Sequence, residues 1–312
     1  MELAIVGLGG GGGYFGYKLA QRYAGDNKLA VTFIARDPTY SVTKQQGLTL
    51  LSPECFKKGV WPARLLSKPS ELSVVDTVLI CVKEYDLERV CEQIKNKMTE
   101  RSVIIPLMNG VDIYERIRRI VPNGIVLPAC VYIASHIKEK GVVEHRGEPG
   151  KIILGKDPQH PEFSPDQLLA TLENAKIDVA FKSDAFPDIW MKFFFIAPFG
   201  LVSARHNRSI GEVNSNPELQ KRARAIMEEI EAIAYGKGIP LPKDIISRSF
   251  SKAGLFPFHT PTSLQLDVQS GKPDNELGLF GETIIRYGKE LGITVPETER
   301  VTKEIKEILG RG

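Results

Sequence analysis

Residues 1–20 read MELAIVGLGGGGGYFGYKLA, an apolar run followed by a turn that is mostly glycine. Residues 3–6 have the composition of a buried parallel strand, and apolar side chains spaced four apart predict a helix over residues 14–23. Glycine inside a regular element is destabilising by roughly 0.5–1 kcal/mol relative to alanine. The turn between the strand and the helix must therefore need bare backbone.

The spacing of these glycines matches a dinucleotide-binding fingerprint, Gly7-x-Gly9-x-x-Gly12, with a strand before it and a helix after it. In such a turn the first glycine allows the tight bend, the second admits a pyrophosphate, and the third lets the helix pack on the strand. The helix N-terminus then faces the anion. Gly10 and Gly11 fall at variable positions of the fingerprint, and we expect both to tolerate substitution.

Further apolar runs alternate with helical patterns, which indicates an α/β fold with a doubly wound parallel sheet. The expected strands are residues 29–36, 76–82, 102–108 and 124–134. Residues 141–155 have the pattern of two antiparallel strands joined by a Gly/Pro turn. No strand pattern follows, and long helical stretches take over, one of them starting at Pro217 in a favoured first-turn position. We predict two domains, residues 1–182 and an all-helical 183–312.

Polar residues stand where three of the expected strands end, which is the edge at which such sheets bind ligands. Arg36 ends the second strand and favours the 2′-phosphate of NADP, whereas the adjacent Asp37 keeps the 2′-hydroxyl of NAD open as a weaker alternative. Lys83 and Asn109 follow the next two strands. Each of these residues also has a simpler interpretation, as a solvated strand end or a turn residue.

The composition argues against several other classes of function. With 41 basic and 38 acidic residues, the net charge of +3 indicates neither nucleic acid nor a membrane surface as a partner. The four cysteines form no CxxC motif, so we expect no zinc site, no other metal and no disulfide framework. We find no signal peptide and no apolar stretch long enough to span a bilayer, and we expect a cytoplasmic protein.

Taken together, the motifs resemble the ketopantoate reductase family, the NADPH-dependent 2-dehydropantoate 2-reductases of pantothenate biosynthesis. The resemblance covers nearly the whole chain. It implies a Rossmann-type N-terminal domain and a helical C-terminal domain, with NADPH in the cleft between them. The motifs that carry it are IVGLGGGGGYFGYKLA, VTFIAR, VLICVKEYDLE, PLMNGV, GKIILG, IWMKF, IGEV, PTSLQLDVQSGK and GKELGITVP.

The resemblance also implies roles for individual residues. The cofactor-binding residues would be Gly7, Gly9, Gly10, Gly11, Gly12, Arg36, Lys83, Asn109, Ala134 and Glu276. The substrate-binding residues would be Asn109, Lys192 and Ser263. Lys192 would be the general acid, and Glu276 would assist catalysis by binding the nicotinamide ribose or the substrate hydroxyl. An alignment without a gap would replace Glu276 by Asn275.

Lys192 also stands out without the family, as a cation beside Trp190 and three phenylalanines on an apolar helix. An ammonium near a keto-acid oxygen would stabilise developing negative charge and donate a proton. The alternative is a lysine whose stem packs on the aromatic rings while its charge reaches solvent. The residue types alone do not decide between these two hypotheses for Lys192; the resemblance favours the general acid.

The chain departs from the family pattern at three positions that usually hold asparagine, which here are Ile196, Gly200 and Ile210. Ser203, His206 and Asn207 are candidate replacements for the lost polar contacts. The departures leave open a relative that reduces a different 2-keto acid or ketone, and a non-catalytic NADP-binding sensor. A homodimer through the helical domain is a further expectation.

Overall fold

The computed structural model describes residues 1–54 and 59–310, which form two compact units, Met1–Ala185 and Phe186–Gly312. Cys55 lies outside the described residues. The other three cysteines are free thiols, and burial raises the pKa of the Cys91 thiol to about 12.

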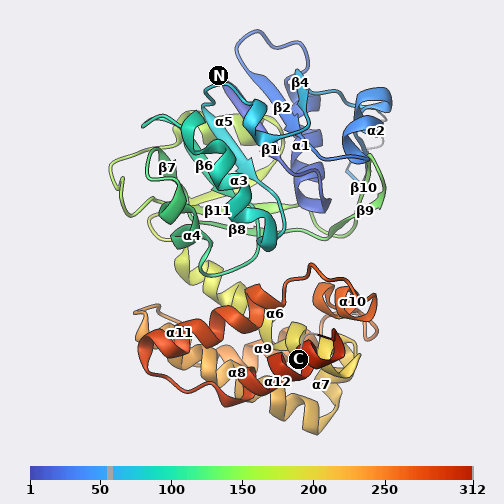
Figure 1. Ribbon diagram of the computed structural model, residues 1–312, viewed down its shortest axis with the longest axis vertical. Helices are drawn as coiled ribbons and strands as arrows, with labels where there is room; N and C mark the ends of the chain where they lie inside the picture. Colours follow the sequence, from blue (N-terminus) through green and yellow to red (C-terminus); the bar gives the residue numbers. More distant parts are fainter. Residues whose placement is uncertain (55–58, 311–312) are drawn as a thin grey trace. The chain divides into compact units, whose positions relative to one another are not determined.

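A six-stranded parallel sheet forms the centre of the first unit (Figure 1). Its strand order is β4-β2-β1-β5-β6-β7, and every pairing in it is parallel. The strands are β1 (Glu2–Val6), β2 (Ala30–Ile34), β4 (Arg64–Leu66), β5 (Thr77–Ile80), β6 (Val103–Pro106) and β7 (Ile125–Val126). This confirms the expected doubly wound parallel sheet, in which β1 lies between β2 and β5.

Helices connect these strands, and the first of them packs its apolar side chains on the sheet. They are α1 (Gly10–Arg22), α2 (Thr39–Gln46), α3 (Leu87–Ile94) and α4 (Ile113–Ile120), with 3₁₀ turns at Pro69–Glu71, Glu84–Asp86 and Lys95–Lys97. A further helix, α5 (Asp166–Asn174), connects two strands of a smaller sheet. Phe15 and Leu19 of α1 are fully buried in one cluster with Ile5 and Phe33 of the sheet. This burial fixes the helix that starts at the glycine turn.

Two small sheets complete the first unit, and they correct two expectations. One is β3 (Thr49–Leu51), β10 (Val142–His145) and β9 (Ser135–Glu139); the other is β12 (Asp178–Lys182), β11 (Lys151–Gly155) and β8 (Ala129–Tyr132). The antiparallel pair expected within residues 141–155 is wrong, because β10 and β11 lie in different sheets. The single strand expected over 124–134 is wrong too. It divides into β7 and β8 near Pro128, which has no N–H to donate to a strand ladder.

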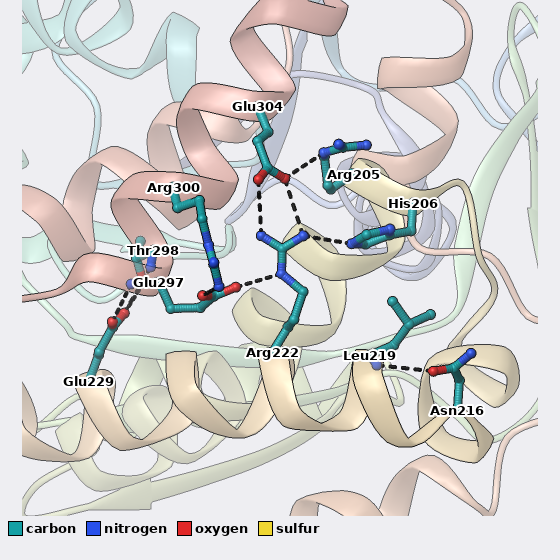
Figure 2. Close-up of polar contacts among 10 residues, drawn as sticks. All are labelled: Arg205, His206, Asn216, Leu219, Arg222, Glu229, Glu297, Thr298, Arg300 and Glu304. Carbon is teal, nitrogen blue, oxygen red and sulfur yellow. Dashed lines mark hydrogen bonds and ion pairs between the residues drawn. The ribbon is translucent and has the colours of Figure 1, made fainter.

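The second unit contains helices and no strand among its described residues, as expected (Figure 1). Its helices are α6 (Phe186–His206), α7 (Ile210–Ser215), α8 (Pro217–Gly236), α9 (Ile245–Ala253), α10 (Ser263–Gln269), a π-helical turn (Gly278–Glu282), α11 (Thr283–Leu291) and α12 (Pro296–Ile308). Helix α8 begins at Pro217 as predicted, and the Asn216 side chain caps it by accepting from the Leu219 N–H at 3.2 Å (Figure 2).

Helix α6 corrects the expectation that no stretch could span a bilayer. By length and composition its 21 residues are sufficient to cross a membrane. However, 67% of that apolar span is buried within the protein. Trp190 stacks on Tyr287 of α11, with ring centroids 6.2 Å apart, and Phe193 contacts Phe280 of the π-helical turn. The apolar character of α6 is thus accounted for by its place in the core of the helical unit.

Candidate functional site

The glycine turn joins β1 to α1 within a few residues. Gly7 has φ +96°, a left-handed conformation that favours glycine, and its N–H donates to the Ile34 carbonyl at 2.9 Å. Gly9 is extended and caps α1, which begins at Gly10, four residues before the expected start at Tyr14. The helix starts early because the glycines themselves form its first turn.

A Cβ atom at the first or third fingerprint glycine would collide with backbone. At Gly7 it would lie 2.9 Å from the Cys81 carbonyl oxygen at the end of β5, and at Gly12 it would overlap the Gly7 carbonyl oxygen. These contacts match the tight bend and the close packing of helix on strand that the fingerprint demands.

Gly10 and Gly11 differ, although both were expected to be tolerant. A Cβ at Gly10 would overlap the Ser135 carbonyl oxygen at the start of β9, so the expectation that Gly10 tolerates substitution is wrong. The sequence could not show this contact, because β9 is more than a hundred residues away along the chain. No described atom lies within 4 Å of a Cβ at Gly11, where tolerance stays a prediction.

The turn fits the pyrophosphate of a dinucleotide. Positions Gly9 and Gly11 both border open space, which a Cβ at either residue would begin to fill. The first backbone N–H groups of a 13-residue helix lie beside that space, and its first turn contains no acidic side chain. Unpaired N–H groups at a helix N-terminus attract anions, so bare backbone and positive potential coincide here.

Arg36 lies two residues beyond β2, and its guanidinium binds the carboxylate of Asp86, which ends the turn after β5. The distance from Arg36 Nη2 to Asp86 Oδ2 is 2.7 Å. Arg89, on the first turn of α3, binds the same carboxylate. The Asp86 side chain is 10% exposed, whereas those of Arg36 and Arg89 are 66% and 52% exposed. Asp86 and Arg89 are not among the site residues predicted from the sequence, although their i,i+3 spacing was a signal for an ion pair.

Three other expected cofactor residues lie in loops of the same unit. Lys83 is exposed and follows β5 by three residues, and Asn109 is half-buried and follows β6 by three residues. Because β5 and β6 are parallel neighbours, the two loops leave the same edge of the sheet. Ala134 is exposed just before β9, and its carbonyl oxygen accepts from the Arg146 N–H at 2.9 Å.

The expected catalytic and substrate residues lie in the helical unit. Lys192 is half-buried on α6, between the buried side chains of Trp190 and Phe193. Ser263 is exposed at the first position of α10, where Thr262 caps the helix.

Asn275 and Glu276 are both buried, 7% and 4% exposed, and the hydrogen bonds of the Asn275 side chain are local. The Asn275 amide nitrogen donates to the Lys272 carbonyl at 2.9 Å, and its oxygen accepts from the Leu277 N–H at 3.1 Å. Both ends of the Asn275 side chain thus hold its own turn. This local role supports the alignment that places Glu276 in the site.

The three departures from the family pattern place residues without polar side-chain atoms in buried or half-buried positions. Ile196 is half-buried one turn beyond Lys192, Ile210 is buried, and a Cβ at Gly200 would be 3.5 Å from the Phe280 ring. Among the candidate replacements, His206 accepts from Arg222 at 2.8 Å and Asn207 accepts from Gln265 at 3.1 Å. Ser203 is fully buried, and its hydroxyl has no hydrogen-bond partner among the described residues.

Comparison with known proteins places these features in context. A family model described as ketopantoate reductase PanE/ApbA matches residues 3–159, and its C-terminal counterpart matches residues 184–309. An uncharacterized oxidoreductase, YkpB of Bacillus subtilis, is 27% identical over 96% of both chains. A 2-dehydropantoate 2-reductase of Mesorhizobium japonicum is 24% identical over 99% of this chain and 98% of that one.

Solved structures show the same fold over the full length. A PanE/ApbA family ketopantoate reductase from Ralstonia eutropha superposes with a TM-score of 0.89 at 25% identity, covering 100% of this chain and 99% of the other. A D-mandelate dehydrogenase with NADH and anilino(oxo)acetate gives 0.85 at 19% identity, with 99% of each chain covered. A dimeric ketopantoate reductase from Staphylococcus aureus gives 0.81 at 18% identity, with both chains fully covered.

Proposed function

This chain belongs to the ketopantoate reductase family and is an oxidoreductase, and from that premise we propose that it reduces ketopantoate to pantoate with NADPH. The observation that carries the proposal is the glycine turn, where Gly9 and Gly11 border open space at a helix N-terminus. Arg36 at the end of β2 supports NADPH over NADH, because a guanidinium forms bidentate, charge-assisted hydrogen bonds with a phosphate.

The residues of the helical unit supply the acid and the substrate contacts. NADPH, which the glycine turn and Arg36 would hold, would supply the hydride for the ketone carbon. As negative charge builds on the ketone oxygen, Lys192 stabilises it and donates the proton that completes the alcohol. Ser263 binds the substrate carboxylate. Glu276, buried and acidic, positions the substrate hydroxyl or the nicotinamide ribose.

A second candidate substrate is a 2-keto acid with a purely alkyl side chain. The observation that favours it is the apolar character of α6 beyond Lys192, where Ile196 and Gly200 offer no side-chain hydrogen bond. Ketopantoate carries a terminal hydroxyl that needs a polar partner when it is buried. Lys192, Ser263 and Glu276 would keep their roles with either substrate.

A matched pair of substrates tests the choice. Ketopantoate and 3,3-dimethyl-2-oxobutanoate differ by the terminal hydroxyl alone, so the ratio of their kcat/KM values measures recognition of that group. A site that hydrogen-bonds the hydroxyl should reject the deoxy compound by orders of magnitude, up to about 10⁴–10⁵ in favourable sites. A ratio near one or below would favour the alkyl substrate. Absence of NADPH oxidation with every 2-keto acid tried would overturn both candidates.

We further propose that the enzyme works as a cytoplasmic homodimer. The dimeric relative from Staphylococcus aureus supports this assembly. Sedimentation equilibrium of the purified protein, whose chain mass is 34.6 kDa, would give a mass near twice that value. A single species at the chain mass would contradict the proposal.

A further inference from the structure

The ion-pair cluster of Arg36, Asp86 and Arg89 bears on how the proposed cofactor is selected. Arg36 follows β2 and Asp86 follows β5, and these two strands are the partners of β1 in the sheet. The contact between Arg36 and Asp86 therefore links the loops on either side of the strand that leads into the glycine turn. The cluster is built entirely within the first unit.

The charge balance of this cluster depends on the second arginine. Arg36 and Asp86 alone form a neutral pair, which would offer little attraction to a phosphate dianion. Arg89 binds the same carboxylate, so the three side chains together carry one net positive charge. The nearby acids Glu84 and Glu88 are held by Arg116 of α4 instead, at 2.9 and 2.7 Å, so their one net negative charge is bound to that guanidinium and not to Arg36 or Arg89.

The geometry of the cluster leaves donors facing solvent. A guanidinium has five N–H donors, and Asp86 accepts two from Arg36 and at least one from Arg89. The buried carboxylate therefore holds both guanidiniums from the inside, while more than half of each arginine side chain is exposed. Two fixed guanidiniums with outward donors can bind the oxygens of a phosphate monoester.

We infer that Arg89 is a specificity-determining residue that binds the 2′-phosphate of NADPH together with Arg36, and that Asp86 is the positioning residue that holds the two arginines as a pair. The inference rests on the proposed function, because it takes NADPH as the cofactor. It goes further in assigning the second guanidinium of the phosphate site to a residue outside the fingerprint and outside the end of β2.

The test measures binding of two probes to the full-length protein by calorimetry at fixed ionic strength: adenosine 2′,5′-bisphosphate and adenosine 5′-monophosphate. The variants are Arg89→Gln, Arg36→Gln and the control Arg101→Gln, which removes an exposed arginine just before β6 at the opposite edge of the sheet. Arg89→Gln should weaken the bisphosphate about tenfold, as expected for loss of a charge-assisted contact, and leave the monophosphate unchanged. The control should bind both probes as the unmodified protein does.

The outcomes separate this inference from the proposal beneath it. If the unmodified protein binds the two probes equally, the preference for NADPH fails, and the role of Arg89 fails with it. If Arg36→Gln loses the bisphosphate while Arg89→Gln keeps it, the cofactor proposal stands and the inference about Arg89 is overturned. Equal weakening of both probes by Arg89→Gln would also overturn it, because that result indicates general damage to the unit; melting curves of each variant report such damage directly.

Discussion

Gly10 and Gly11 are neighbours in the first turn of α1, yet a methyl group would meet opposite surroundings at the two positions. We predict that Gly10→Ala lowers the melting temperature, because its Cβ would overlap the Ser135 carbonyl oxygen. Gly11→Ala should leave it unchanged or slightly raised, since its Cβ meets no described atom and alanine favours the helix. Thermal melts of the two variants without cofactor give the comparison; similar melts would contradict the assigned contact.

Lys192 is the residue on which the chemistry depends. Lys192→Ala should reduce turnover by at least about a hundredfold, the lower range for general acid catalysis, while NADPH still binds. Lys192→Arg should restore little, because a guanidinium is a poor proton donor and differs in shape. Steady-state rates are to be measured beside melting curves. Normal turnover with a lowered melting temperature would instead show a lysine that only packs against Trp190 and Phe193.

Asn275 and Glu276 give a prediction that separates stability from activity. Asn275→Ala removes two hydrogen bonds within its own turn and should lower the melting temperature with little change in kcat. Glu276→Gln keeps the size of the side chain but removes its charge, and should lower kcat/KM with little change in stability. The reverse pattern, with the catalytic loss at position 275, would show that the ungapped alignment is correct.

The sequence predicted strands and helices where the pattern is local, but it did not predict which strands pair in the smaller sheets. The strand before Gly7, the helix at Pro217 and the alternation of strands with helices that predicts a parallel sheet are each visible in nearby residues. By contrast, β10 pairs with β3, which lies about ninety residues earlier, and nothing in the Gly/Pro turn between β10 and β11 reveals this. The start of α1 was misplaced for a related reason, because glycine has low helix propensity and its contacts with β9 are non-local.

Helices α6, α8 and α12 share a network of charged side chains around Arg222 (Figure 2). Arg222 donates to Glu297 at 2.6 Å and to His206 Nε2 at 2.8 Å, and it also contacts Glu304. Arg205 donates to the same Glu304 carboxylate at 2.5 Å. Because His206 accepts from a cation, the network requires a neutral imidazole.

This network predicts how stability depends on pH. Burial, together with the charges of Arg222 and Arg205, lowers the pKa of His206, so the folded protein binds this proton less readily than the unfolded chain. The stabilisation is therefore present above about pH 6.5, the usual histidine pKa, and is lost as the pH falls through the lowered value. His206→Gln should reduce the loss of melting temperature between pH 7.5 and pH 5.5. The control is His259→Gln, at an exposed histidine of the same unit; an identical pH response in both variants would exclude His206 as the source.

The residues assigned to the reaction are divided between two compact units, and this division limited what the sequence could predict. The fingerprint glycines and the polar strand ends indicate a cofactor site, because their spacing follows from the geometry of one βαβ unit. Lys192, Ser263 and Glu276 follow no such local rule. They were identified through the family resemblance, and their assignment remains a prediction.

The division also predicts which amides are protected from exchange when the cofactor binds. NADPH should raise the melting temperature of the full-length protein, since a ligand at 100 times its Kd stabilises the folded state by about 2.7 kcal/mol. In hydrogen–deuterium exchange, NADPH alone should protect the amides of residues 7–13 and 81–89 most strongly. The amides of α8 and α12, far along the chain from the glycine turn, should change least. Protection confined to the helical unit would contradict the assignment of the cofactor site to the first.

The glycine turn has a consequence for how the gene can change. Every single-nucleotide missense change in a glycine codon introduces a side chain with a Cβ atom. At Gly10 and Gly12 that atom would overlap a backbone oxygen, of Ser135 and of Gly7 respectively, and a backbone oxygen cannot rotate away as a side chain can. We therefore expect no missense change at Gly10 or Gly12 to be neutral, whereas we expect some changes at Gly11, between them, to be tolerated. A run of identical residues is thus expected to contain both intolerant and tolerant positions, and a saturation library scored for folded protein would separate them.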